Sequence, residues 1–205
     1  MELRDAMARR RMVRDFDGAA IPAEQLAALC TEALAAPTAG NSRGIELVAL
    51  DGTLGVSRYL DAATDPDWRE ASPRAEGFAR AGAAVLVVCD PEAYARRYAE
   101  PDKRGSGLHE TSGWPVPYWY GDAGAVTLSL LLLAVDAGLG ACFLGAFRNA
   151  SRVLRSVGAP ADRTLYGCVL LGGASRPQVR GASLRRPGPP RSARVHLGGY
   201  DRAPR

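Results

Sequence analysis

The sequence has few of the residues that build metal centres and disulfide frameworks. Its 205 residues include four cysteines and two histidines. The cysteines are Cys30, Cys89, Cys142 and Cys168, and the histidines are His109 and His196. No C-x-x-C pair occurs and each cysteine lies inside an apolar segment, so we expect buried thiols in a reducing compartment and no metal site. The first residues contain no apolar stretch of the kind found in signal peptides, so we expect a cytoplasmic protein.

Lysine is almost absent, because Lys103 is the only one among 26 basic residues. The formal net charge of +4 is mild, and it does not predict a nucleic-acid partner. The arginines gather at 9–14 and at 176–194. Guanidinium groups bind phosphate or carboxylate with two parallel hydrogen bonds, so two such groups favour an anionic ligand. A solvated surface in an arginine-rich composition explains the same pattern equally well.

Charge is missing from the stretch between Asp122 and Asp136. A helix that is apolar on nearly all sides is buried on nearly all sides, and this one is shorter than the roughly 20 residues that cross a bilayer. We expect no membrane contact and a central helix in a core or a dimer interface. Asp122 is predicted as its N-cap and Gly138 as its C-terminal stop.

The remaining pattern predicts an α+β fold in one domain, residues 1–205, without internal repeats. Helices are expected at 3–13, 23–35, 53–81 with two proline interruptions, 91–97 and 149–157, and strands at 45–50, 83–89, 141–144 and 165–171. The loop at 100–120 is aromatic and is expected to be ordered, either as a lid over a pocket or packed on a partner subunit. Residues from about 176 to 205 are expected to form an extended basic tail that wraps the domain or a second copy, with a short extended piece at 193–197.

Two short motifs suggest other functions. Gly40 to Gly44 matches the G-x-S-x-G pattern of serine hydrolases, with Ser42 as the nucleophile, but the expected order is helix, loop, strand rather than strand, serine, helix. Gly138-Leu139-Gly140 follows a helix and enters a strand, which is the reverse of the dinucleotide-binding arrangement. A serine hydrolase remains a minor alternative, and a Rossmann site is rejected.

Five segments in order resemble the FMN-dependent nitroreductase family. Arg10 to Phe16 resembles the opening R-R-S-x-R-x-F, and Ala36 to Asn41 resembles the A-P-S-A-G-N loop. Asp122 to Ala125 with Gly138 to Gly140 resembles the long helix at the family's dimer interface. Phe143 to Phe147 resembles the strand that lies against the flavin. The last strand and basic tail of the family are resembled by Val169 to Gly172 with Arg185, Arg186, Val195 and His196. The resemblance implies a central mixed, mostly antiparallel sheet flanked by helices, in an intertwined homodimer.

The same resemblance implies FMN as the cofactor and assigns its contacts. The implied cofactor-binding residues are Arg10, Arg11, Met12 and Arg14 from the first segment, Pro37, Thr38, Ala39 and Asn41 from the second subunit, Phe143, Leu144 and Gly145 along the ring, and Arg185 and Arg186 from the tail. Tyr118, Trp119 and Tyr120 are hypothesised to shape the acceptor pocket. No catalytic side chain is expected, because the flavin carries the hydride chemistry.

Two positions depart from the family pattern. Met12 stands where the family has serine, which removes a hydroxyl contact to the phosphate, and Arg43-Gly44-Ile45 replaces Q-P-W. The leading prediction is an FMN-dependent oxidoreductase that passes hydride from NAD(P)H or an organic donor to a small nitro, quinone or flavin acceptor. The alternatives are a flavin-dependent dehydrogenase of secondary metabolism that returns electrons to oxygen, and a flavin-binding protein without turnover.

Overall fold

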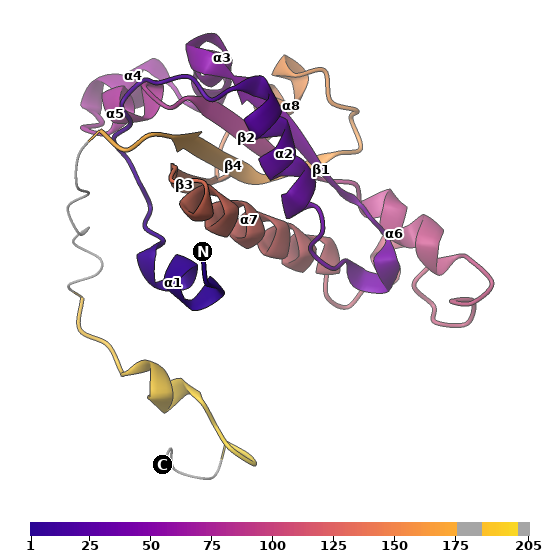
Figure 1. Cartoon of the computed structure of the whole chain (residues 1–205). Helices are drawn as coiled ribbons and strands as arrows, with labels where there is room; N and C mark the ends of the chain where they lie inside the picture. Colours follow the sequence, from indigo (N-terminus) through magenta and orange to yellow (C-terminus); the bar gives the residue numbers. More distant parts are fainter. Residues whose placement is uncertain (176–185, 201–205) are drawn as a thin grey trace.

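The computed structural model describes residues 1–175 and 186–200, and it contains one four-stranded sheet with helices on both faces (Figure 1). The strands are β1 (Ile45–Asp51), β2 (Ala83–Cys89), β3 (Gly140–Gly145) and β4 (Thr164–Gly172), in the order β1-β2-β4-β3. Each neighbouring pair is antiparallel. The predicted α+β class with a mostly antiparallel sheet is therefore confirmed.

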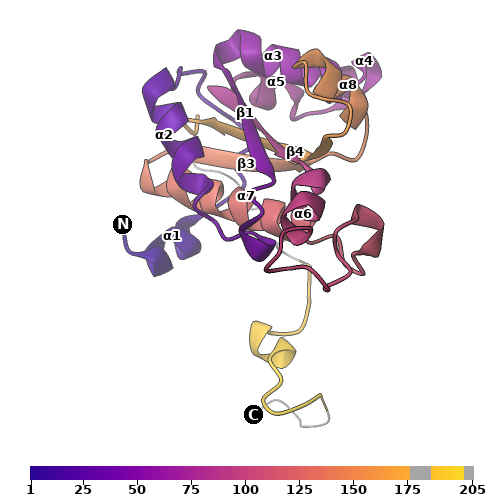
Figure 2. The same ribbon diagram turned by 90° about the vertical axis from the view of Figure 1, so that its right-hand side faces the viewer.

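The helices form two layers around this sheet. They are α1 (Leu3–Arg9), α2 (Ala23–Ala33), α3 (Gly52–Ala63), α4 (Pro66–Ala71), α5 (Ala75–Ala79), α6 (Pro91–Tyr98), α7 (Tyr118–Asp136) and α8 (Ala150–Ser156), with 3-10 turns η1 (Ala39–Asn41), η2 (Thr111–Gly113) and η4 (Arg191–Arg194). Helices α2 and α7 pack on one face, and α3, α5 and α8 on the other (Figure 2). Strand β2 is buried along its whole length, as its continuous apolar sequence predicts.

Helix α7 begins earlier than its charge pattern predicts. It starts at Tyr118 after Pro117, so the prediction of Asp122 as its N-cap is wrong. Asp122 lies inside the helix, where its carboxylate accepts hydrogen bonds from other segments. The other end is as predicted: Gly138 has a φ of 73°, and the Leu139 N–H bonds to the Ala134 carbonyl at 2.7 Å. This bond and the left-handed glycine form a Schellman stop.

Helix α1 ends at Arg9, four residues before its predicted end. The chain is extended from there because it pairs with the sheet edge: Met12 forms a parallel bridge with Ala141, and Phe16 an antiparallel bridge with Ala174. This pairing carries the first arginine group to the start of β3.

The aromatic loop before α7 is anchored to the body of the protein by Trp114, and most of its other residues are exposed. Trp114 is buried and lies against the rings of Tyr94, Tyr98, Tyr118 and Trp119, and its indole N–H bonds to the Leu108 carbonyl at 3.0 Å. The expectation of an ordered loop is confirmed.

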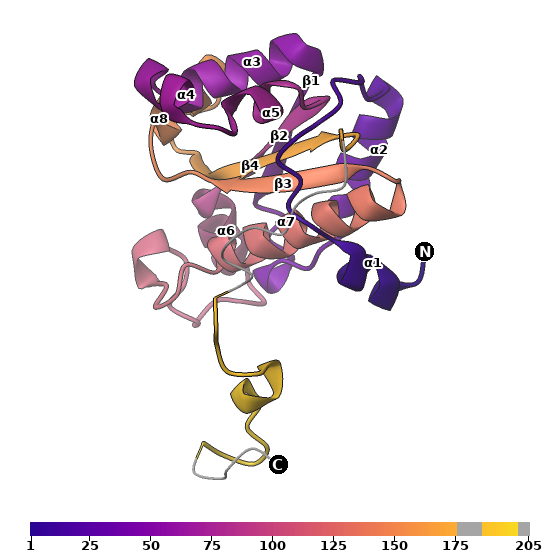
Figure 3. The same cartoon turned by 90° about the vertical axis from the view of Figure 1, so that its left-hand side faces the viewer.

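The described tail residues, 186–200, extend away from the sheet and α7 in all three views (Figures 1, 2 and 3). They contain η4 at Arg191–Arg194, so the predicted extended piece at 193–197 is wrong at its start. The basic tail therefore does not wrap its own chain where it is described.

Candidate functional site

A cavity of about 430 Å³ opens where β3 ends beside α3 and α4. Its lining combines Tyr59, Leu60, Ala63, Thr64, Asp65, Trp68 and Phe78 with Phe143, Leu144, Gly145, Ala146, Phe147, Arg148, Asn149, Val153 and Leu165. The volume and the mostly apolar, aromatic lining are typical of a small-molecule site. All three residues predicted to face a flavin ring, Phe143 to Gly145, lie in this wall.

The first arginine segment lies beside the same strand. The Val13 N–H donates to the Ala141 carbonyl at 2.9 Å, and the Phe143 N–H donates to the Met12 sulfur at 3.4 Å. Met12 therefore contacts the wall of the cavity directly. The structure thus brings together two of the predicted groups, residues 10–14 and 143–145, that are 129 or more residues apart in the sequence.

Within this segment, Arg10 has an unpartnered buried nitrogen. Its Nη1 atom is enclosed and lacks a hydrogen-bond partner among the described residues. A buried donor without an acceptor costs about 1–3 kcal/mol, and more when it is charged, so such a group in a native structure calls for a ligand or another explanation. Arg11 instead bonds to the carbonyls of Ala8 and Arg10 and lines a second, more open hollow of about 620 Å³.

Arg14 lies near Cys142 of β3. Its guanidinium donates to the Met12 carbonyl at 3.2 Å. Burial raises the pKa of the Cys142 thiol, and the positive charges of Arg14 and Arg74 oppose this shift. Arg74, immediately before α5, is therefore a second cation near this strand. It was not singled out from the sequence because it stands apart from both arginine groups.

The loop containing Pro37, Thr38, Ala39 and Asn41 lies at the same end of the sheet as the cavity but beside the opposite edge. It leads into β1 at Ile45, whereas the cavity adjoins β3, and β2 and β4 separate these strands. Strands are spaced about 4.8 Å apart, so roughly 14 Å separate the two edges. None of the four residues lines the cavity in this chain.

This loop has an unusual backbone that is held at several points. Gly40, Asn41 and Arg43 all have positive φ, between 54° and 62°. The Gly40 carbonyl accepts from Arg97 at 2.8 Å, and the Ala39 N–H donates to Asp122 at 2.8 Å. Left-handed backbone persists only where surrounding contacts over-determine it, so the loop is pre-shaped to present its surface.

Asp122 is the central acceptor of these contacts. Besides Ala39, its Oδ2 atom accepts from the Tyr94 hydroxyl at 2.7 Å. Burial raises the pKa of Tyr94, and the hydrogen bond to Asp122 acts in the same direction, so this hydroxyl stays a donor. Asp122 thereby joins α7, α6 and the loop.

The Asp122→Ala variant is expected to lower the free energy of unfolding by about 2–4 kcal/mol, because it leaves two donors to a charged acceptor unpaired. Urea denaturation followed by circular dichroism measures this change. Tyr94→Phe removes one of the two bonds and is expected to cost about half as much. Equal stability of Asp122→Ala and the unmodified protein would contradict the anchoring role.

The three predicted acceptor-pocket residues occupy different environments. Trp119 is buried among aromatic rings, and Tyr118 is exposed. Tyr120 is partly exposed and stacks on Tyr166, which stacks in turn on Phe143 in the cavity wall, with centroids 6.4 and 5.5 Å apart. None of the three lines the cavity of this chain. Their role in an acceptor pocket stays a prediction.

The structure describes only one of the two tail arginines that were predicted to bind FMN. Arg185 lies outside the described residues, and Arg186 is exposed in the segment that extends away from the body. The single chain does not bring Arg186 to the first arginine segment.

The outer side of α7 is apolar, and it is open around Gly121 and Leu128. Gly121, Ala125, Leu128, Leu132 and Val135 recur every three or four residues along it, which places them on one face of the helix. The side chain of Leu128 is 46% exposed, and Gly121 is also exposed. Figure 3 shows α7 below the sheet, and the side of the helix that does not face the sheet is turned away from the body. Helix α7 is long and apolar enough to cross a membrane, and the core helix of a soluble protein passes the same test.

Several cavity residues were missed from the sequence. Tyr59, Trp68, Phe78 and Asn149 come from segments that read as ordinary helix or turn, and only the packing of α3, α4 and α8 around β3 assembles them. The hydroxyl of Ser42, by contrast, donates to the Ala39 carbonyl and follows a 3-10 turn, so the serine-hydrolase order is absent at this position.

The comparisons with known proteins agree on one family. The model of the nitroreductase family matches residues 7–173. A nitroreductase family protein from Clostridium difficile 630 is similar in structure, with a TM-score of 0.70, 18% identity, and coverage of 97% of this chain and 99% of that chain.

Two other similar solved structures are of proteins whose descriptions mention FMN. An FMN-dependent nitroreductase from Clostridium difficile R20291 has a TM-score of 0.66 and 15% identity, covering 95% of this chain and 98% of that chain. A protein from Exiguobacterium sibiricum 255-15, described as a nitroreductase in complex with FMN, has a TM-score of 0.66 and 17% identity, covering 90% and 95%. At these identities the likeness shows the shared fold.

Proposed function

The chain belongs to the nitroreductase family, and from this premise we propose that it is an FMN-dependent oxidoreductase acting as a homodimer. The proposed reaction passes hydride from NAD(P)H, or from an organic donor, to a small acceptor such as a nitro, quinone or flavin compound. Cytoplasmic localisation is part of the proposal and is supported by four buried, free thiols.

The observation that carries the proposal is an apolar cavity at the end of β3 together with an arginine segment that runs beside the same strand and contains an unpartnered buried donor. FMN combines a flat ring, which suits the lining at Phe143 to Gly145, with a phosphate dianion, which suits guanidinium groups. The buried Nη1 of Arg10 lacks an acceptor among the described residues, and a phosphate oxygen would supply one. The residues present therefore fit the cofactor.

The protein contributes binding and shielding in this proposal. When bound, FMN supplies the hydride-transfer chemistry. The side chains of Tyr59, Phe78 and Leu165 exclude water from the inner part of the cavity. Burial raises the pKa of Tyr59, and neighbouring Cys168 acts in the same direction, so its hydroxyl stays protonated. The carboxylate of Asp65 forms an ion pair with Arg152, and the cavity lining contains no other acidic residue.

A second copy of the chain completes the proposed site. The open apolar face of α7 supports a helix-to-helix contact, with Gly121 and Ala125 allowing close approach and Leu128 providing buried area. The loop at 37–41 cannot reach the cavity of its own chain, so we assign its flavin contacts to the partner's cavity. We assign the tail arginines in the same way.

Anaerobic titration of the purified protein tests the proposal. We expect a yellow protein whose released cofactor has the mass of FMN, and whose absorbance near 450 nm, typical of oxidised flavins, is bleached by NADH or NADPH. A bound flavin that neither nicotinamide reduces, but that an organic substrate reduces and oxygen reoxidises, would instead indicate a dehydrogenase. Bound flavin that no donor reduces would indicate a carrier, and absence of flavin binding would contradict the proposal.

A further inference from the structure

The cavity has two walls that come from distant parts of the chain. One wall is the end of α3 and the start of α4, from Tyr59 to Trp68. The other is the segment 143–149, which leads from β3 into α8. No strand pairing joins the two walls in the described residues. Their separation depends on the apolar packing of α8 against α3 and on polar contacts at the rim.

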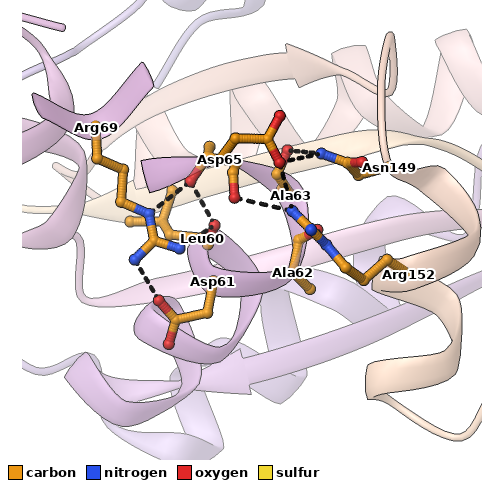
Figure 4. Close-up of polar contacts among 9 residues, drawn as sticks. Leu60, Asp61, Ala62, Ala63, Asp65, Arg69, Asn149 and Arg152 are labelled. Atoms are coloured by element: carbon orange, nitrogen blue, oxygen red, sulfur yellow. Dashed lines mark hydrogen bonds and ion pairs between the residues drawn. The ribbon is translucent and has the colours of Figure 1, made fainter. Parts of the chain in front are cut away.

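Two residues of α8 and its entry make the polar contacts at the cavity rim (Figure 4), and Arg58 of α3 bonds to the Ser156 carbonyl farther from the cavity. Arg152 donates from Nε to the Ala62 carbonyl at 2.5 Å and from Nη2 to the Thr64 carbonyl at 2.9 Å. Asn149 donates from Nδ2 to the Ala63 carbonyl at 3.2 Å. These three carbonyls stand at the end of α3, where helix geometry leaves them without intrahelical donors.

Asp65 completes the group from the side of α4. Its Oδ1 atom accepts from Arg152 at 3.2 Å and from Asn149 at 3.4 Å. The positive charge of Arg152 also lies at the negative end of the α3 dipole, which favours this position. The contacts thus connect both walls at the rim of the cavity.

Asn149 has a left-handed backbone at this point. Its φ of 56° lies in the left-handed region, which asparagine adopts more readily than most residues other than glycine. Asn149 therefore combines a sharp turn of the chain with a side chain that bonds to the end of α3 and to Asp65.

Arg69 holds the outer part of the same wall. It donates to the Thr64 hydroxyl at 2.7 Å, to the Leu60 carbonyl at 3.3 Å and to Asp61 at 2.5 Å (Figure 4). The neighbouring Trp68 lines the cavity on one side and a smaller hollow of about 220 Å³ on the other. The position of Trp68 therefore follows from the position of α4.

We propose that Asn149, Arg152 and Asp65 form a clamp that sets the width of the ring-binding cavity, with Asn149 and Arg152 as positioning residues for the flavin ring. The inference rests on the proposed function, because the ring is assigned to this cavity. It goes beyond that function by naming residues that hold the two walls together and do not contact the phosphate.

Arg152→Ala is expected to weaken binding of lumiflavin, which is the flavin ring without a phosphate chain, by about 10-fold, and FMN by the same factor. Arg152→Lys offers one donor group in place of a planar fork and is expected to recover only part of this loss. Titration of the apoprotein, followed by quenching of flavin fluorescence, measures both affinities. The visible spectrum of bound FMN is expected to shift in Arg152→Ala toward that of free FMN.

Two further variants separate positioning from folding. Arg155→Ala is the matched control, because Arg155 is exposed on the same helix, and it is expected to change neither affinity. Asn149→Gly keeps the left-handed turn at no steric cost but removes the carboxamide, so it is expected to weaken lumiflavin binding in a stably folded protein.

The outcomes are distinct from those that test the function itself. Unchanged lumiflavin affinity and spectrum in both Asn149→Gly and Arg152→Ala, with reduced unfolding free energy, would overturn the clamp and leave only a helix cap. If the unmodified apoprotein binds neither FMN nor lumiflavin, the proposed function fails before the clamp is reached, and the clamp fails with it.

Discussion

The Leu128→Arg variant is expected to be monomeric and to lose its flavin. Leu128 lies at the middle of the open apolar face of α7 and is 46% exposed in the single chain. In a two-fold contact each copy would bury one Leu128, and each burial contributes about 1.5–3 kcal/mol. Two facing arginines would remove both contributions and add repulsion, so the dimer dissociation constant is expected to rise by at least about 100-fold.

Sedimentation velocity over a range of concentrations, with detection at 280 and about 450 nm, follows both mass and flavin. Leu54→Arg is the matched control, because Leu54 is also an apolar helix residue and is 86% exposed on α3, away from the proposed interface. We expect this variant to remain dimeric and yellow. A dimeric Leu128→Arg protein with normal flavin content would contradict the assignment of the α7 face.

The Arg10→Ala variant is expected to bind FMN about 10- to 150-fold more weakly, while its affinity for riboflavin stays unchanged. The reason is the buried Nη1 atom of Arg10, which lacks an acceptor among the described residues and suits a phosphate oxygen. Riboflavin carries the same ring and ribityl chain without the phosphate, so the comparison isolates the anion. Isothermal titration of the apoprotein with both ligands measures the difference.

Arg9→Ala serves as the control, because Arg9 is exposed and its guanidinium donates a hydrogen bond to the Met1 sulfur at the surface. Arg186→Ala is expected to resemble Arg10→Ala if the partner's tail reaches the phosphate. Equal losses of FMN and riboflavin affinity in Arg10→Ala would show that this arginine supports the fold or the ring site instead of the phosphate.

These two variants also test different parts of the proposed function, namely dimer formation and phosphate binding. Leu128→Arg tests whether the site needs two copies, and Arg10→Ala tests what one copy contributes to the phosphate. Loss of FMN in the second variant with an intact dimer would show that Arg10 acts on the phosphate and not through dimer formation. Together with Arg152→Ala, which is expected to weaken ring binding, they assign separate parts of the cofactor to separate segments.

Local patterns sufficed to predict most helices and strands. The continuous apolar run at 83–89 predicted β2 with its observed bounds, because a strand buried on both faces needs no alternation. The glycine at 138 predicted the end of α7, since a left-handed stop needs a residue without a side chain. The motif order from Arg10 to Gly172 was enough to identify the family.

The misplaced features depended on distant partners. Asp122 looked like a cap because it stands before an apolar run, but its carboxylate bonds to Tyr94 and Ala39. Helix α1 ended early because Met12 pairs with Ala141, a contact across 129 residues that no local pattern predicts. In both cases a long-range hydrogen bond competed with the local preference and prevailed.

The sequence by itself determined the family, the order of elements, the arginine segments and the apolar character of the central helix, because each follows from the type and spacing of nearby residues. Only the tertiary structure decided which of those residues meet. It placed Met12 against Phe143, left the Arg10 nitrogen buried without an acceptor, and joined Asn149 and Arg152 to the end of α3. Such contacts depend on how distant helices and strands pack, and packing is a property of the whole chain.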